Sequence, residues 1–307
     1  MVTVQSAVRD PAVLPLFKSP EGEARFMDAY DAVLRAWPVP YQELDLPTRL
    51  GRTHVIASGA RSALPLLLLP SMAGTATLWR PNVAALSAHY RTYAVDTIGQ
   101  VGKSAPARRI RDRQQCADWL GDLLDALEVR RTSIVGSSYG GFLAMNQALL
   151  TPDRVDRVVL ISPAGTFVGG LVWVFLRARL KRLLTGDKRP RGITDLLGEG
   201  AQLDPSDAAW GALMAVTLSD SARPNLVSPR VFSKSELAAN RIFTLLLIGE
   251  HELLYEPTAT LRLALERMPG LSGAIVHNAH HLAALACPHD VNARILRFLG
   301  EAGGQSD

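Results

Sequence analysis

Three side chains in this sequence have the types and the order needed for nucleophilic catalysis. Ser138 stands at the centre of a Gly-x-Ser-x-Gly pattern over residues 136–140, and Glu252 and His281 follow it along the chain. A serine hydroxyl is a weak nucleophile, so it needs an imidazole to take its proton and a carboxylate to orient that imidazole. The order serine, acid, histidine therefore predicts acyl transfer through a covalent serine intermediate.

The residues around Ser138 fit a sharp turn between a strand and a helix. Residues 132–135 are rich in β-branched side chains, as in a buried strand, and residues 139–150 carry apolar side chains at helical spacing. The neighbours two positions from the serine lie too close on such a turn for side chains, a condition that Gly136 and Gly140 meet. The helix would direct the positive end of its dipole at the serine. This context favours Ser138 as the nucleophile over a chance glycine-rich loop.

The acid and the base each follow a later strand. Residues 243–248 form a strongly apolar run that ends in a turn, residues 249–255, which contains Glu252. Residues 274–276 indicate a last strand, shortly before His281. Because functional groups in open parallel sheets gather at the carboxyl ends of the strands, we expect the serine, the acid and the histidine to converge there.

Each of the three candidates has a rival nearby in the sequence. Ser137 directly precedes Ser138, and His280 directly precedes His281. Glu250 lies two positions before Glu252. Ser137 would need a different glycine frame. Asp96 would replace the acid only if the active-site loop folded unusually. The sequence favours the first three candidates and leaves these alternatives open.

The elements that must position these residues alternate between strand and helix over residues 64–161. The predicted strands are 64–69, 91–95, 132–135 and 155–161, and the predicted helices are 78–90, 114–127 and 139–150. A helix over 17–37 and a hairpin of 41–46 with 53–57 precede them. The alternation predicts an α/β fold with a mostly parallel central sheet and helices on both faces.

The alternation breaks after residue 164 and resumes with the strand at 243. Residues 165–237 contain helical stretches, 171–184 and 207–218, joined by loops with proline and glycine. The simplest organisation is a hydrolytic core of residues 1–164 and 238–307 with a helical cap of residues 165–237 inserted in it. The cap aromatic residues that would line a substrate pocket, or equally pack in the core, are Trp173, Trp210 and Phe232.

A basic cluster lies within the predicted cap. Its members are Arg177, Arg179, Lys181, Arg182, Lys188, Arg189 and Arg191, and only Asp187 offsets them. A solvated outer face is the favoured interpretation. Attraction of an anionic substrate or of an acidic membrane surface is the alternative.

The composition is that of an ordinary globular protein. The chain has 307 residues, 48% hydrophobic and 20% charged, with a formal charge of +4. The longest apolar run, 167–176, is about half of what a membrane span needs, and we expect no span and no secretory signal. Cys116 and Cys287 are too far apart in sequence for a paired metal or redox motif, which favours reduced thiols and a cytoplasmic location.

Two patterns resemble ligand motifs but lack essential parts. Gly102-Lys103-Ser104 imitates the end of a phosphate-binding loop, yet Thr97 stands where that loop requires glycine, so we expect no nucleotide site. The histidines near the C-terminus lack acidic or cysteine partners at suitable spacing, so we expect no metal. No organic cofactor and no nucleic acid are expected either.

The motifs described above resemble the α/β-hydrolase superfamily and, more narrowly, the bacterial carboxylesterases typified by naproxen esterase. The resemblance covers residues 30–299 and is weakest in the cap. It implies hydrolysis of small-molecule carboxylic esters, with Glu252 as the acid and the backbone amides of Met72 and Tyr139 forming the oxyanion hole. One departure is that Pro70-Ser71 stands where the superfamily normally has His-Gly.

Related chemistries remain open at this point. A serine at position 138 argues against the dehalogenases and epoxide hydrolases of this fold, which resemble enzymes that need aspartate there. Hydrolysis of thioesters, lactones, amides or carbon–carbon bonds would use the same acyl-enzyme apparatus. A non-catalytic, ligand-binding member of the fold is the alternative from a different class.

Overall fold

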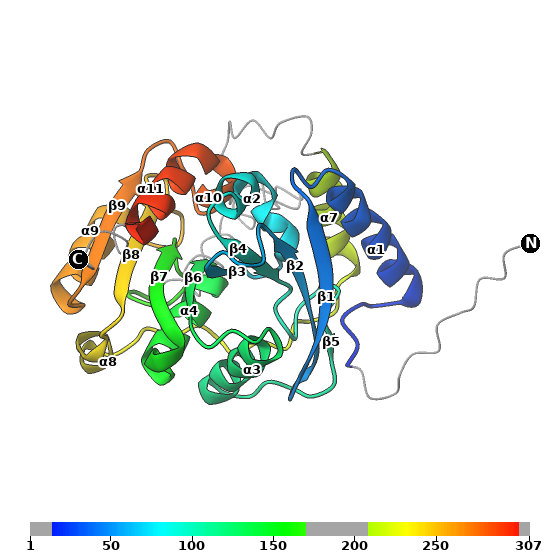
Figure 1. Cartoon of the computed structure of the whole chain (residues 1–307), viewed down its shortest axis with the longest axis horizontal. Helices are drawn as coiled ribbons and strands as arrows, with labels where there is room; N and C mark the ends of the chain where they lie inside the picture. Colours follow the sequence, from blue (N-terminus) through cyan, green and yellow to red (C-terminus); the bar gives the residue numbers. More distant parts are fainter. Residues whose placement is uncertain (1–13, 170–207, 301–307) are drawn as a thin grey trace, which may run out of the picture.

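A twisted central β-sheet organises the computed structural model, which describes residues 14–169 and 208–300 (Figure 1). Its main strands are β1 Tyr41–Thr48, β2 Gly51–Ser58, β3 Pro65–Leu69, β4 Arg91–Val95, β6 Thr132–Ser137, β7 Val155–Ile161, β8 Phe243–Gly249 and β9 Leu271–Val276. Their spatial order is β1-β2-β4-β3-β6-β7-β8-β9, and the short β5 Ala105–Pro106 pairs with β2. Strands β1 and β2 are antiparallel to each other, β2 is antiparallel to β4, and the strands from β4 to β9 run parallel.

Strand β3 shows why helices cover both faces of the sheet. Leu66 and Leu68 belong to one buried apolar cluster, while Leu67 and Leu69 belong to another on the opposite face. Successive side chains of a strand point to opposite faces, so an uninterrupted run of leucines demands cover on both. On one face lie helices α2 Arg80–Ser87, α10 Ala283–Ala286 and α11 Pro288–Gly300; on the other lie α3 Arg113–Ala126, α4 Tyr139–Leu150 and α9 Pro257–Arg267.

The N-terminal helix α1 (Pro20–Arg35) packs beside helix α7 (Ala208–Asp220), as Figure 1 shows at the edge of the sheet. Ser19 caps α1 by accepting a hydrogen bond from the amide of Gly22. The guanidinium of Arg25 pairs with the Asp220 carboxylate at 2.8 Å, and the Asp220 carbonyl accepts from the amide of Lys18. These contacts join the last turn of α7 to the N-terminal half of α1 and to the residue before its cap.

Residues 221–233, here called the strap, return from α7 to helix α8 (Lys234–Ala239). The amide of Asn225 donates to the carbonyl of Gly99 at 2.7 Å, and the amide of Phe232 donates to that of Thr166 at 3.1 Å. The ring of Phe232 is fully buried and stacks on Phe142 of α4, with the ring centroids 5.7 Å apart. Phe232 is therefore a packing residue that holds the strap against the core.

The α/β architecture predicted from the alternation of strands and helices is confirmed, and several element boundaries differ from the prediction. The region expected as one helix over 78–90 is a short 3-10 helix, η1 Ala76–Trp79, followed by α2. The hydroxyl of Thr75 caps η1 by accepting from the amide of Thr77, so the helical segment starts earlier than its apolar spacing indicated. The last strand begins at Leu271 instead of residue 274, and β5 was not predicted.

Some predictions on the cap fall on residues that are not described. The basic cluster, Trp173 and the helix expected over 171–184 lie outside the described residues. The helix expected over 207–218 is α7, and Trp210 on it is only 2% exposed and belongs to the same apolar cluster as α1.

Candidate active site

Ser138 lies at the junction of β6 and α4 in a strained backbone conformation. Its φ is +50° and its ψ is −108°, a region that residues with a Cβ rarely occupy. Hydrogen bonds hold the turn on both sides: the Ser138 amide donates to Ile161, and its carbonyl accepts from the amide of Ala164. Because the turn is fixed from the neighbouring strand end, the strain persists in the folded state and presents the serine side chain above the sheet.

The two motif glycines are required by close backbone contacts. A Cβ added at Gly136 would overlap the carbonyl oxygen of Gly140, and one added at Gly140 would overlap the carbonyl oxygen of Leu69. The first turn of α4 is therefore pressed against β6 and against the end of β3. The absence of side chains at these two positions allows the sharp turn that carries Ser138.

His281 and Glu252 meet Ser138 at the carboxyl ends of the strands. The Nε2 atom of His281 lies 2.8 Å from Ser138 Oγ, and its Nδ1 atom lies 2.8 Å and 2.9 Å from the two carboxylate oxygens of Glu252. A carboxylate only accepts hydrogen bonds, so Nδ1 carries the proton in the neutral ring. The lone pair of Nε2 then faces the serine hydroxyl, as a general base requires.

The Glu252 carboxylate is buried and kept ionised by its surroundings. Oε1 also accepts from the amides of Leu253 and Leu254, at 2.8 Å and 2.9 Å. Burial alone would raise the pKa of Glu252, but the charge and hydrogen bond of His281, the Leu254 amide and the hydroxyl of Ser162 hold it below its ordinary value. The carboxylate therefore stays negative beside the imidazole and stabilises it when it becomes protonated.

The rival residues make other contacts. Glu250 accepts from the amide of Asn278 at 2.9 Å and is 3.5 Å from His277, so it supports the loop before the candidate histidine. The ring of His280 packs on His251, with centroids 5.0 Å apart. Ser137 is buried within β6, and its Oγ has no hydrogen-bond partner among the described residues.

Asp96, the fourth rival, belongs to a second buried network on the other side of the site. Its carboxylate accepts from the hydroxyl of Tyr30 at 3.1 Å, the amide of Ala76 at 2.7 Å and the amide of Lys103 at 2.8 Å, and it lies 3.1 Å from His54 Nδ1. None of these partners is a residue of the Ser138, His281 and Glu252 chain. Asp96 thus fixes the loop after β4 and the start of η1.

The two predicted oxyanion donors lie on neighbouring strand ends. Tyr139 is the first residue of α4, and the amides of a helix's first turn have no acceptor within the helix. Met72 lies in the turn after β3, the strand that pairs with β6. In that turn the amide of Gly74 donates to the carbonyl of Ser71 at 3.0 Å, so Pro70 and Ser71 support a compact turn in place of the usual His-Gly.

The role of Ser162 beside the acid was not predicted from the sequence. Ser162 is fully buried at the end of β7 with a φ of +43°, and its hydroxyl contributes to lowering the pKa of Glu252. One feature of the sequence could have indicated this role: Ser162 directly follows the strand 155–161, which lies between β6 and β8 in the sheet.

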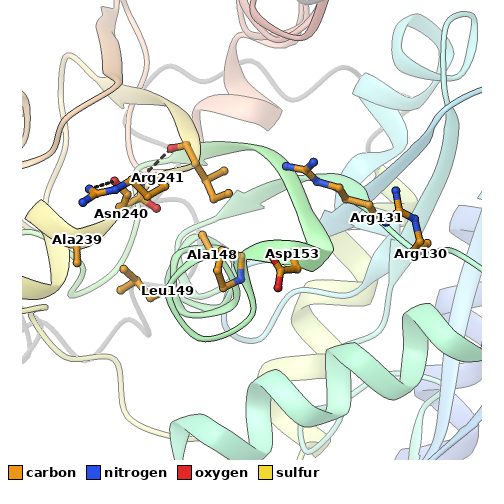
Figure 2. Close-up of a pocket in the computed structure, with 10 residues that line it drawn as sticks. Arg130, Arg131, Ala148, Leu149, Asp153, Ala239, Asn240 and Arg241 are labelled. Carbon is orange, nitrogen blue, oxygen red and sulfur yellow. Dashed lines mark hydrogen bonds between the residues drawn. The ribbon is translucent and has the colours of Figure 1, made fainter.

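A separate surface cavity of about 590 Å³ lies at the far end of α4 (Figure 2). Its lining includes Ala148 and Leu149 of that helix, with Arg131, Asp153 and Arg241 around them. Ala148 is ten residues from Ser138 along the helix, or roughly 15 Å at the normal helical rise. The cavity is therefore distinct from the candidate active site.

Metal-binding clusters and membrane-spanning helices are both absent from residues 14–169 and 208–300. In those two ranges, no group of three or more His, Cys, Asp or Glu side chains is placed to hold a metal ion. Within the same ranges, no helix has the length and apolar character needed to cross a membrane.

Comparisons with known proteins agree with the fold. Residues 65–195 match the family model described as the alpha/beta hydrolase fold. The carboxylesterase YbfK of Bacillus subtilis is 36% identical over 92% of this chain and 96% of its own, and the uncharacterized carboxylesterase nap of the same organism is 34% identical over 92% and 94%. The crystal structure of naproxen esterase from Bacillus subtilis superposes with a TM-score of 0.82 at 33% identity, covering 92% of this chain and 99% of that one. The chain belongs to the α/β-hydrolase family and, within it, to the group of bacterial carboxylesterases that includes naproxen esterase.

Proposed function

We propose that Ser138, His281 and Glu252 form the catalytic triad with which this carboxylesterase-family member hydrolyses small-molecule carboxylic esters. The observation that carries the proposal is the continuous chain of short contacts, 2.8 Å from serine to histidine and 2.8 Å from histidine to glutamate. The charge and the donor set of Glu252 support its role as the orienting acid.

Acylation begins when Ser138 Oγ attacks the ester carbonyl carbon and its proton passes to His281 Nε2. The carbonyl oxygen of the tetrahedral intermediate becomes an anion, which the amides of Tyr139 and Met72 receive. Collapse of the intermediate breaks the bond to the alkoxy oxygen, and His281 returns its proton to the departing alcohol. Each oxyanion donor of this kind is typically worth about 2.7–4 kcal/mol to the barrier.

Deacylation repeats the same proton transfers with water. His281 removes a proton from a water molecule, whose oxygen attacks the acyl carbon of the serine ester. The second tetrahedral intermediate collapses to release the carboxylic acid, and the proton returns to Ser138 Oγ. Glu252 remains ionised throughout and stabilises the imidazolium in both halves of the cycle.

The experiment that tests the proposal is turnover of short-chain nitrophenyl esters by wild type and Ser138→Ala. Wild type should turn over rapidly, and the variant should lose about 10⁴-fold or more in kcat because no nucleophile remains. Ser137→Ala is the matched control, since it removes the adjacent buried hydroxyl, and it should keep kcat close to wild type. Equal turnover by wild type and Ser138→Ala would favour a non-catalytic binding protein instead.

The cap and the cellular location complete the proposal. We infer that residues 165–237 form a cap over a core of residues 1–164 and 238–307, which the contact of the strap with Gly99 supports. Limited proteolysis should then cut first within 165–237, and first cuts inside the core would contradict this division.

The two free cysteines, Cys116 and Cys287, support a reducing, cytoplasmic location, which cell fractionation tests.

A further inference from the structure

The turn that carries Met72 contains little to hold its own shape. Residues 71–75 are small except for Met72, whose side chain is 37% exposed and gives the turn little packing. Ala73 has a φ of +59°, in the left-handed region that is unfavourable for residues with a Cβ. One hydrogen bond closes the turn, from the amide of Gly74 to the carbonyl of Ser71. The conformation therefore depends on groups outside the turn.

Gln100 supplies those groups from the loop after β4. Its Oε1 accepts from the amide of Ala73 at 3.0 Å, and its Nε2 donates to the carbonyls of Gly74 at 3.0 Å and Ser71 at 3.4 Å. The side chain is only 1% exposed. One buried amide thus holds three backbone groups on both sides of Met72.

The backbone beside Gln100 is itself fixed from the cap side. Gly99, with a φ of +87°, accepts at its carbonyl from the Asn225 amide of the strap at 2.7 Å. At the other end of the turn, Asp96 accepts from the amide of Ala76. Gln100 therefore connects the loop after β4, which the strap holds in place, to the turn that contains Met72.

We propose that Gln100 is a positioning residue for ester hydrolysis, which fixes the turn after β3 so that the Met72 amide is held ready for the oxyanion. This inference rests on the proposed function, because the role of Met72 belongs to that proposal. Gln100 is buried and its side-chain amide bonds to the backbone of residues 71–74, so it acts through that backbone. Its loss should therefore raise the barrier of the chemical step and leave substrate binding largely intact.

The test measures kcat and KM for nitrophenyl butyrate in Gln100→Ala, with the melting temperature recorded for each protein. We expect kcat to fall by about 10- to 100-fold, as for a displaced transition-state donor, with KM within about two-fold of wild type. Gln147→Ala is the matched control. Gln147 is also a fully buried glutamine, and its Nε2 donates to Thr151 at 2.6 Å near the far end of α4. Its replacement should lower the melting temperature while kcat stays close to wild type.

Gln100→Glu gives a second readout that a merely stabilising residue would not change. The variant keeps an acceptor for Ala73 but places a carboxylate against the carbonyls of Ser71 and Gly74, and protonation restores one donor. The ratio of its kcat to that of wild type should therefore rise as the pH falls. This variant also tests the proposal if Gln100→Ala does not fold, provided circular dichroism shows that it is folded.

The outcomes separate this inference from the proposed function. The role of Gln100 is overturned if Gln100→Ala keeps the wild-type kcat. It is also overturned if the kcat of folded Gln100→Glu, relative to wild type, is constant with pH. In either case, an inactive Ser138→Ala would still support the triad. Full activity in Ser138→Ala overturns the proposed function itself. Equal losses of kcat in Gln100→Ala and Gln147→Ala would reduce Gln100 to a structural residue.

Discussion

The choice between the two carboxylates of the turn after β8 depends on where their oxygens lie. Glu252 has a side chain without exposed surface and meets the histidine ring directly, whereas the side chain of Glu250 is 41% exposed and meets a backbone amide. A glutamate has one more methylene group than the aspartate usual in this superfamily. Here the extra length is accommodated because the carboxylate turns back to accept from the two amides that follow it, those of Leu253 and Leu254.

Substitution of each carboxylate by its amide separates their roles. Glu252→Gln should lower kcat by about 10²- to 10⁴-fold, because an amide facing Nδ1 no longer stabilises the protonated ring and favours the wrong tautomer. Glu250→Gln, the matched control two positions away, should retain most of the activity. Steady-state kinetics with a nitrophenyl ester checks both variants. A larger loss in Glu250→Gln than in Glu252→Gln would mean that the acid has been assigned to the wrong residue.

The residues that sequence analysis identified are those marked by a local pattern. Ser138 has its glycines, and Glu252 and His281 each follow an apolar strand, so their positions at one sheet edge follow from the parallel topology. Gln100 and His54 lie in no local sequence pattern of this kind. Gln100 bonds to Ala73, 27 positions away, and His54 lies beside Asp96, 42 positions away, and only the folded chain brings those groups together.

At the scale of the elements, the start of α4 depends on the absence of a side chain at position 140. Gly140→Ala would place a methyl group on the carbonyl of Leu69, which belongs to a buried strand and has little room to move. We expect a loss of about 1–3 kcal/mol in the free energy of unfolding, together with reduced activity as the turn at Ser138 opens. Gly121→Ala in α3 is the matched control, since a Cβ there meets nothing within 4 Å.

The control should change stability in the opposite direction. An alanine at position 121 lowers the entropy cost of forming the helix and should add about 0.5–1 kcal/mol. Urea unfolding measures both variants. If Gly140→Ala proved as stable and active as wild type, the contact between α4 and the end of β3 would not constrain the serine turn.

The parts of the fold that could not be predicted are those set by capping and by distant contacts. The leucines of β3 and the apolar residues of β8 have lengths and compositions that define strands on their own. The start of η1 instead depends on the Thr75 hydroxyl and the Asp96 carboxylate. The strap has no periodic pattern, because its amides bond to Gly99 and Thr166 in other parts of the chain.

At the scale of the whole molecule, a charge network centred on the buried side chains of His54 and Asp96 joins the N-terminal helix to the sheet. His54 lies 3.0 Å from Glu43 of β1 and 3.1 Å from Asp96 at the end of β4, and Tyr30 of α1 donates to the same aspartate. The ammonium of Lys103 completes the network by pairing with Glu43 at 2.6 Å and with Asp31 of α1 at 2.7 Å. Burial alone would lower the pKa of His54, but the hydrogen bonds and charges of Asp96 and Glu43 raise it above its ordinary value.

This raised pKa makes stability depend on pH in a defined direction. The folded state binds the proton of His54 more tightly than the unfolded state, so its stabilising contribution is fully present below the unfolded pKa of about 6.5. The contribution is lost as the pH rises through the higher folded pKa. The urea midpoint of wild type should therefore decline over that window, and His54→Gln should reduce the decline.

The matched control for this prediction is His277→Gln, at a side chain that is 76% exposed. It should follow the wild-type dependence on pH. Urea midpoints measured from pH 6 upward, in steps at constant ionic strength, give the comparison. A decline of the same size in His54→Gln and wild type would show that the network does not hold the extra proton.

The 143 positions between Ser138 and His281 have a consequence for biosynthesis. During synthesis the proposed nucleophile, Ser138, is made 143 residues before the proposed base, His281. With the proposed triad, we expect the polypeptide to be inactive toward esters until the late segment that contains His281 docks. Two separately expressed fragments, divided between these residues, would thus report their own reassembly through restored turnover.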